Sequence, residues 1–160
     1  MKRIILVRHA KSDWPEGLDD FDRPLAKSGQ NDAKLMSEFL KNNNVSIDHF
    51  VSSPALRTRS TCEIFNEQYQ IKCSFAEPLY HPSEDNILSV IYNLDNRYNT
   101  VALFSHNNGI SNFANAFTNK IIHMPTCGTF AFDIECDSWS EFEGAKKNFA
   151  FFYEPKKIMK

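Results

Sequence analysis

Two arginines and two histidines stand at or shortly after the ends of three short apolar segments: Arg8, His9, Arg57 and His106. If these segments are parallel strands of one sheet, their carboxyl ends meet at the edge where α/β proteins bind ligands. Guanidinium groups bind phosphate oxygens through paired hydrogen bonds, and helix N-termini add positive field. A partly unprotonated histidine is a competent nucleophile near neutral pH. These residue types predict a site where one histidine attacks a phosphoryl group and the other helps to hold its charge.

No metal or cofactor is expected at this site. Arg8, Arg57 and a protonated His106 would together neutralise the transferring phosphoryl group. The four cysteines are scattered, without Cys-x-x-Cys spacing or histidines at metal-ligand spacing. Each of the site residues alone has an ordinary explanation as a surface charge, a helix cap or an ion-pair partner. Their joint placement carries the prediction.

The elements that would position these residues alternate along the chain. Continuous apolar runs without polar alternation predict strands covered on both faces, at 4–7, 50–51 and 101–104. Helical spacing, caps and stop signals predict four helices: over 33–40 with a stop at 42–44, from the Ser53-Pro54 pair, after Ser83, and from about Asn107.

The C-terminal third has a different pattern. Apolar residues alternate with others over 130–134 and again over 149–153, which predicts two strands joined by the polar stretch 137–147. They are expected to extend the sheet at an edge. Alternating strands and helices predict an α/β fold, a single domain over 1–160 with helices on both faces of a mostly parallel central sheet.

Composition excludes several partners. The chain has 160 residues, 18 Lys and Arg against 20 Asp and Glu, and a formal net charge of −2. Nucleic-acid binding is not expected, because it requires a strongly basic chain or stripe. The first apolar run has four residues, too few for a signal segment or membrane span, so no membrane partner is expected. With scattered cysteines that favour a reducing compartment, the sequence predicts a cytoplasmic protein and gives no oligomeric state.

Several motifs resemble a known family. Residues 8–12 (Arg-His-Ala-Lys-Ser) resemble the Arg-His-Gly/Ala signature of the histidine phosphatase superfamily, with its phosphoglycerate mutase-like three-layer α/β/α sandwich. Residues 22–33, 52–61 and 105–107 are similar to further blocks of its SixA-like phosphohistidine phosphatases. The resemblance covers nearly the whole chain. It implies that His9 becomes phosphorylated and that Arg8, Arg57 and His106 form the phosphate pocket.

The general acid is the main departure from the family. Mutases and many phosphomonoesterases of the superfamily use a Glu between the second arginine and the second histidine. Glu77 and Glu84 lie in that interval without the expected motif, and Glu84 is also explained as a favourable charge at a helix N-terminus. An alcohol leaving group needs a proton from a general acid, and such an acid raises the rate by about 10²–10⁴. Imidazole has a pKa of about 6.5 and can leave, or be protonated, without a dedicated donor. The sequence therefore favours phosphohistidine, on a protein or a small molecule, as substrate.

Two residues are secondary candidates for substrate binding, Ser12 through its hydroxyl and Asn107 through a backbone or amide donor, although a turn and a helix cap explain them equally well. His81, in a turn beside a proline, is a further candidate acid. Two other functions stay open: a broad phosphomonoesterase or mutase acting on oxygen esters with Glu77 or Glu84 as acid, and a non-catalytic phosphate- or phosphohistidine-binding module.

Overall fold

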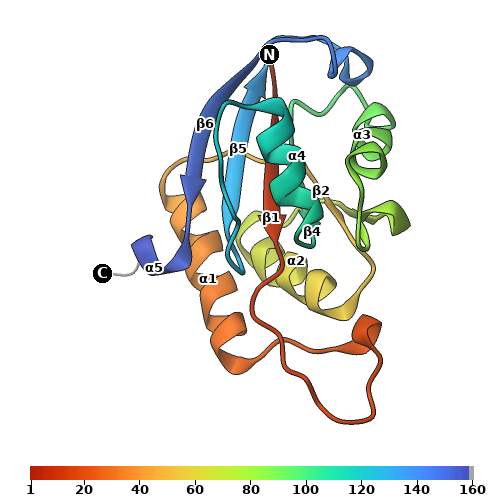
Figure 1. Cartoon of the computed structure of the whole chain (residues 1–160). Helices are drawn as coiled ribbons and strands as arrows, with labels where there is room; N and C mark the ends of the chain where they lie inside the picture. Colours follow the sequence, from red (N-terminus) through yellow and green to blue (C-terminus); the bar gives the residue numbers. More distant parts are fainter. Residues whose placement is uncertain (159–160) are drawn as a thin grey trace.

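A single six-stranded sheet forms the centre of the computed structural model, which describes residues 1–158 (Figure 1). The strands are β1 (Lys2–Arg8), β2 (His49–Ser52), β3 (Cys73–Phe75), β4 (Thr100–Ser105), β5 (Thr129–Ile134) and β6 (Lys147–Tyr153). Their order is β3-β2-β4-β1-β5-β6. The first four are parallel, and β5 and β6 are antiparallel to their neighbours at one edge. The predicted α/β class, the mostly parallel sheet and the C-terminal strand pair are confirmed.

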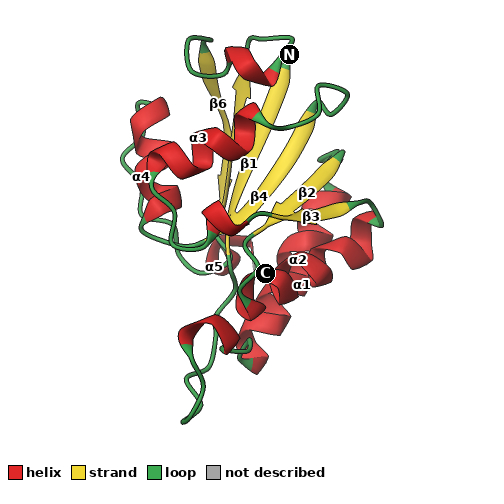
Figure 2. Ribbon diagram, turned by 90° about the vertical axis from the view of Figure 1, so that its right-hand side faces the viewer, coloured by secondary structure: helices red, strands yellow, loops and turns green. Residues whose placement is uncertain are grey.

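Helices cover both faces of the sheet, as the edge-on view in Figure 2 shows. They are α1 (Lys27–Asn42), α2 (Leu56–Tyr69), α3 (Glu84–Tyr92), α4 (Gly109–Phe117) and α5 (Pro155–Ile158). One apolar core lies between the sheet and α1 and α2, and a second lies between the sheet and α3 and α4. Among residues 1–158, no helix is both long and apolar enough to span a membrane.

Strand register brings the predicted site residues together. In the pairing of β1 with β4, Arg8 lies opposite Ser105, so His9 and His106 leave the sheet side by side. In the pairing of β2 with β4, Ser52 lies opposite Phe104. The segment that leads from β2 to α2 therefore begins at the same edge of the sheet. The residues that follow three parallel strands therefore lie at one edge of the sheet, as predicted for the carboxyl ends of such strands.

Three details differ from the sequence-based expectation. The helix predicted from Ser53-Pro54 begins at Leu56, because the Ser53 hydroxyl is engaged by the Ala55 amide and the His106 ring. The helix predicted from about Asn107 begins two residues later. Strand β3 was not predicted, because its three residues are too few to establish a strand pattern.

The segment between β1 and α1 projects beyond the carboxyl edge of the sheet and carries the short 3₁₀ helix η1 (Asp20–Asp22) (Figure 1). Its two ends are held together at the base, where the Ala26 amide donates to the Lys11 carbonyl oxygen at 2.9 Å and Ser12 bridges to Leu25. Gly29 of α1 makes this close approach possible, since a Cβ there would collide with the Lys11 carbonyl group.

Gly29→Ala tests the importance of this contact. Alanine favours a helix over glycine, but here its Cβ would lie against Lys11 backbone atoms, 2.9 Å from the carbonyl carbon. We expect the free energy of unfolding to fall by about 1–3 kcal/mol, as for overpacked sites, when measured by urea denaturation. Gly144→Ala, where a Cβ meets nothing within 4 Å, should leave stability unchanged. Equal stability of the two variants would contradict the proposed packing role.

Candidate active site

A cavity of about 360 Å³ opens at the carboxyl edge of the sheet. Six of its lining residues are those predicted from the sequence: Arg8, His9, Ser12, Arg57, His106 and Asn107. The other six are His81, which the sequence analysis names as a candidate acid, and Lys11, Trp14, Asp20, Arg23 and Thr126. A second cavity of about 420 Å³, beside β2, β3 and α3, is lined by none of these residues.

His9 is held as a neutral imidazole with a free lone pair. Its Nδ1 lies 2.8 Å from the Ala10 carbonyl oxygen, which accepts a hydrogen from it. This assigns the lone pair to Nε2, which accepts from Arg57 Nε at 3.3 Å. Burial, reinforced by the charges of Arg57 and Arg8, lowers the pKa of His9 to about 4. At neutral pH, Nε2 is therefore an unprotonated nucleophile facing a cation.

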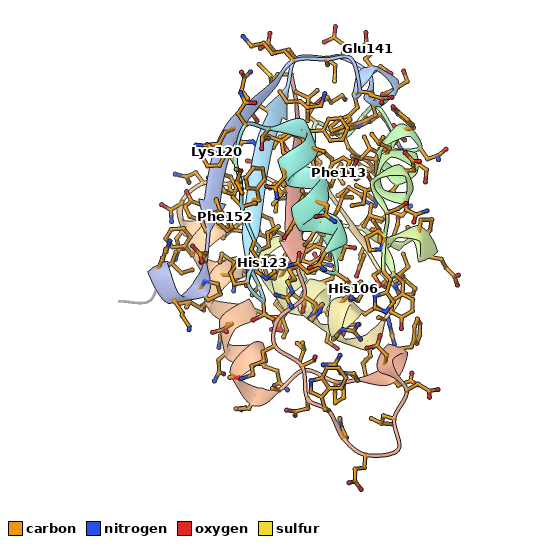
Figure 3. The ribbon with its side chains drawn as sticks, viewed as in Figure 1. His106, Phe113, Lys120, His123, Glu141 and Phe152 are labelled. Carbon is orange, nitrogen blue, oxygen red and sulfur yellow. The ribbon has the colours of Figure 1, made fainter. Side chains whose placement is uncertain are left out.

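His106 is the second histidine of the site, and Figure 3 shows it near the end of the sheet from which the projecting segment extends. Its Nε2 lies 2.8 Å from Ser53 Oγ and 3.1 Å from Thr58 Oγ1, and Arg57 Nη2 donates to its Nδ1 at 3.3 Å. Burial, followed by the charges of His9 and Arg57, lowers the pKa of His106 to about 2. The protonated His106 expected beside a phosphoryl group therefore stays a prediction for the anion-bound site, since burial and Arg57 favour the neutral ring in the protein alone.

Arg57, on the first turn of α2, is 2% exposed and uses both edges of its guanidinium. The outer edge donates to Asp20, from Nη1 to the carbonyl oxygen at 2.6 Å and from Nη2 to Oδ2 at 3.0 Å. The inner edge faces His9 and His106. The carboxylate therefore fixes the group while Nε and Nη2 point toward the histidines.

Arg8 supplies a second guanidinium. Its Nη1 donates to the Met124 carbonyl oxygen at 3.0 Å, whereas its buried Nε has no hydrogen-bond partner within the described residues. A buried donor without a partner is rare in proteins and calls for an explanation. Because Arg8 lines the cavity, an anion oxygen is a fitting acceptor.

Asp20 is a site residue that the sequence did not reveal. Its carboxylate accepts hydrogen bonds from Tyr80 Oη at 2.7 Å, Arg57 Nη2 at 3.0 Å and Arg23 Nη1 at 3.2 Å, and it lies 3.1 Å from His81 Nε2. Burial alone would raise its pKa, but hydrogen bonds from Tyr80, Arg57 and Arg23 hold the pKa well below its usual range. Asp20 is therefore an ionised counter-charge, unsuited to donate a proton.

The remaining predictions have mixed outcomes. Neither Glu77 nor Glu84 lines the cavity; they lie in the 3₁₀ helix Glu77–Leu79 and on the first turn of α3. Ser12 lines it and accepts a hydrogen bond from Arg23. Asn107 also lines it, but its amide donates to the Met124 carbonyl oxygen and its Oδ1 accepts from a serine of α4, so its side chain links parts of the fold.

Comparison with known proteins identifies the family of the chain. The family model of the histidine phosphatase superfamily (branch 1) matches residues 4–80. An uncharacterized chloroplastic protein of Arabidopsis thaliana is 30% identical over 155 residues, covering 88% of this chain and 70% of that protein. The chain belongs to the histidine phosphatase superfamily. An uncharacterized protein of Mycobacterium leprae (strain TN) is 30% identical over 118 residues, covering 71% of this chain and 72% of that protein. The alignment with an uncharacterized Mycobacterium tuberculosis protein (31% identity) covers 62% of each chain.

Solved structures of this superfamily share the fold. A structure of the protein histidine phosphatase SixA complexed with tungstate superposes with a TM-score of 0.84 at 18% identity, covering 98% of this chain and 99% of that one. The SixA structure from Agrobacterium tumefaciens superposes with a TM-score of 0.83 at 23% sequence identity, covering 96% of this chain and 98% of that one. A mycobacterial glucosyl-3-phosphoglycerate phosphatase in complex with VO3 superposes with a TM-score of 0.72 at 14% sequence identity, covering 94% of this chain and 98% of that one. At these identities the likeness shows a SixA-like fold alone.

The lowered pKa of His9 predicts a pH effect on stability. Between its folded value of about 4 and the ordinary 6.5, the unfolded chain binds a proton at this position that the folded chain excludes. The free energy of unfolding should therefore fall as the pH drops through this window. We expect a shallower pH dependence in His9→Gln, measured by urea denaturation at several pH values. An unchanged slope would mean that His9 is not held neutral.

Proposed function

We propose that the chain is a metal-independent phosphohistidine phosphatase that works through a phosphohistidine intermediate on His9. Membership of the histidine phosphatase superfamily supports phosphatase activity. The observation that carries the finer proposal is the state of His9: an imidazole with its lone pair on Nε2, beside two arginines and a second histidine in one cavity.

In the first step, His9 Nε2 attacks phosphorus and the bond to the leaving group breaks. Arg8 and Arg57 donate to the phosphoryl oxygens, where charge is spread in the transition state. The dianion also raises the proton affinity of a neighbouring imidazole, so that His106 can protonate at Nδ1 and donate as well. Water then attacks phosphorus, the bond to His9 breaks, and inorganic phosphate leaves.

The acid–base groups of the site favour a phosphorus–nitrogen bond. Glu77 and Glu84 do not line the cavity, and Asp20 is ionised and held by two arginines. An alkoxide leaving group without a carboxylic acid donor is expelled slowly, whereas imidazole leaves more readily. The glucosyl-3-phosphoglycerate phosphatase in the same fold keeps oxygen esters as the second candidate substrate class.

The surroundings of the cavity favour a phosphohistidine carried by a protein. The projecting segment exposes Trp14 (77%) and Leu18 (47%), and Trp14 lines the cavity. Exposed large apolar side chains next to a site are typical of protein-binding surfaces.

Trapping the intermediate tests the mechanism. The wild-type protein, incubated with labelled substrate and quenched without acid, should carry one phosphate on His9, located by mass spectrometry of peptides. His9→Ala should lose activity by at least about 10³-fold, as for removal of a nucleophile, and vanadate should inhibit the wild type. His123→Ala, an exposed histidine that is not in the cavity lining, is the matched control. A phosphate on another residue would contradict the proposal.

Substrate preference tests the finer assignment. We expect a histidine-phosphorylated protein or peptide to be hydrolysed with a kcat/KM at least about tenfold above that of phosphoserine or sugar phosphates, because no carboxylic acid aids an alkoxide. Phosphate release is measured under identical conditions for each substrate, with and without chelator. Equal efficiency on oxygen esters, or activity that requires added Mg²⁺, would favour one of the alternatives.

A further inference from the structure

We propose that His81, oriented by Asp20, donates the proton to the leaving group and later accepts one from the attacking water. The inference rests on the proposed function, whose phosphorylated His9 it takes as given. It assigns the general acid–base role to an imidazole, the further candidate that the sequence offers beside Glu77 and Glu84; as a weaker acid than a carboxylic acid, it still leaves phosphohistidine the favoured substrate.

The backbone holds His81 firmly at the rim of the cavity. His81 follows the 3₁₀ helix Glu77–Leu79 and has a φ of 49°, a left-handed conformation that non-glycine residues rarely adopt. On its C-terminal side, Pro82 packs against Gly109, where a Cβ would lie 2.7 Å from the proline Cγ. Ser83 then begins α3 with a reciprocal capping box. An uncommon backbone conformation held by packing on its C-terminal side is often found at functional sites.

The hydrogen bond to Asp20 determines how His81 presents its ring. Nε2 lies 3.1 Å from Asp20 Oδ2. An ionised carboxylate can only accept, so Nε2 carries a hydrogen and Nδ1 is the nitrogen left to exchange a proton. A carboxylate that holds an imidazole in one orientation is a recurring arrangement for proton transfer. The side chain is 57% exposed, so an incoming leaving group can reach it.

The position of the ring relates His81 to the phosphoryl site. Its centroid is 5.3 Å from that of His106, and the His106 centroid is 5.2 Å from that of His9. A phosphoryl group held against His106 is therefore within reach of the nucleophile and of His81. All three rings line the same cavity.

Other titratable groups around His81 are already engaged in hydrogen bonds with one another or with neighbouring side chains. Asp20 is ionised, and the Tyr80 hydroxyl donates to it at 2.7 Å; burial, together with that carboxylate, raises the pKa of Tyr80. Arg57 is bound on both edges, and His106 is surrounded by hydroxyl groups and a guanidinium. His81 is the imidazole among them whose Nδ1 remains available on the solvent side.

The proton balance closes over the two steps. His9 Nε2 forms a bond to phosphorus, and the electron pair of the breaking bond stays on the leaving nitrogen or oxygen, which takes the Nδ1 proton of cationic His81. Water then attacks phospho-His9, its proton passes to the now neutral His81 Nδ1, and the electron pair of the P–N bond returns to His9 Nε2. His81 begins and ends as imidazolium, and the net reaction consumes one water.

Leaving-group dependence distinguishes an acid from a structural residue. For His81→Ala, we expect kcat/KM on phenyl phosphate, whose phenolate is a poor leaving group, to fall about 10²–10⁴-fold. On 2,4-dinitrophenyl phosphate, whose leaving group needs no proton, the loss should stay below about tenfold, since protonation contributes little there. Added imidazole should restore part of the phenyl phosphate activity of His81→Ala beyond any effect on the wild type. His123→Ala is the matched histidine control.

Asp20→Asn tests the positioning role. The amide removes the charge that orients His81 but keeps the size of the side chain. We expect the same selective loss on phenyl phosphate, superimposed on a rise in KM for both substrates because Asp20 also holds Arg57. Equal loss of kcat on the two substrates in both variants would mean that these residues are structural and would overturn the proposal.

A trapping measurement separates this inference from the proposed function. If the wild type carries no phosphate on His9, the proposed function itself fails. If His9 is phosphorylated, and His81→Ala forms the intermediate from phenyl phosphate as fast as the wild type, the role of His81 is overturned while the proposed function stands.

Discussion

The buried guanidinium of Arg57 links every part of the site. It lies between His9 and His106 on one edge and Asp20 on the other, at 2% exposure. A charge buried this deeply is unfavourable unless it is paired and hydrogen-bonded. Asp20 supplies the pairing, and the histidines must stay neutral beside the cation. Because α2 begins at Leu56, one residue before Arg57, the start of that helix determines where all these groups meet.

A second arginine organises the projecting segment, which has little regular structure. Arg23, 8% exposed, donates to the Asp13 carbonyl oxygen, the Ser12 hydroxyl and the Asp20 carboxylate, and its guanidinium lies 3.2 Å from the centroid of the Trp14 ring. Hydrogen bonds to charged groups are stronger than neutral ones. They allow a segment without an apolar core of its own to place Asp20 accurately against Arg57. The segment is therefore part of the site.

The sequence predicts the site residues that strand ends position, and it does not predict those that only tertiary contacts bring into the site. Arg8, His9 and His106 stand at strand ends, and parallel register alone brings such ends together. Asp20 could not be identified, because the projecting segment carries several acidic residues without periodicity and only tertiary contacts distinguish one of them. The lowered pKa of His106 in the protein alone could not be predicted for a related reason. Its pKa depends on burial and on the charges gathered around it, and neither is visible in the sequence.

The charges around the cavity also explain why the proton for the leaving group is expected from a group other than His9 and His106. Burial, together with the cations that attract the phosphoryl group, lowers the pKa of His9 and of His106 in the protein alone, so neither ring holds a proton ready for the leaving group. A donor must then stand outside the arginine pair, where a carboxylate can orient it. His81 meets both conditions, because its Nε2 contacts Asp20 Oδ2, the same carboxylate oxygen that accepts from Arg57 Nη2. Asp20 thus connects the two proposed roles in one cavity, with the nucleophile on the arginine side and the acid on the solvent side.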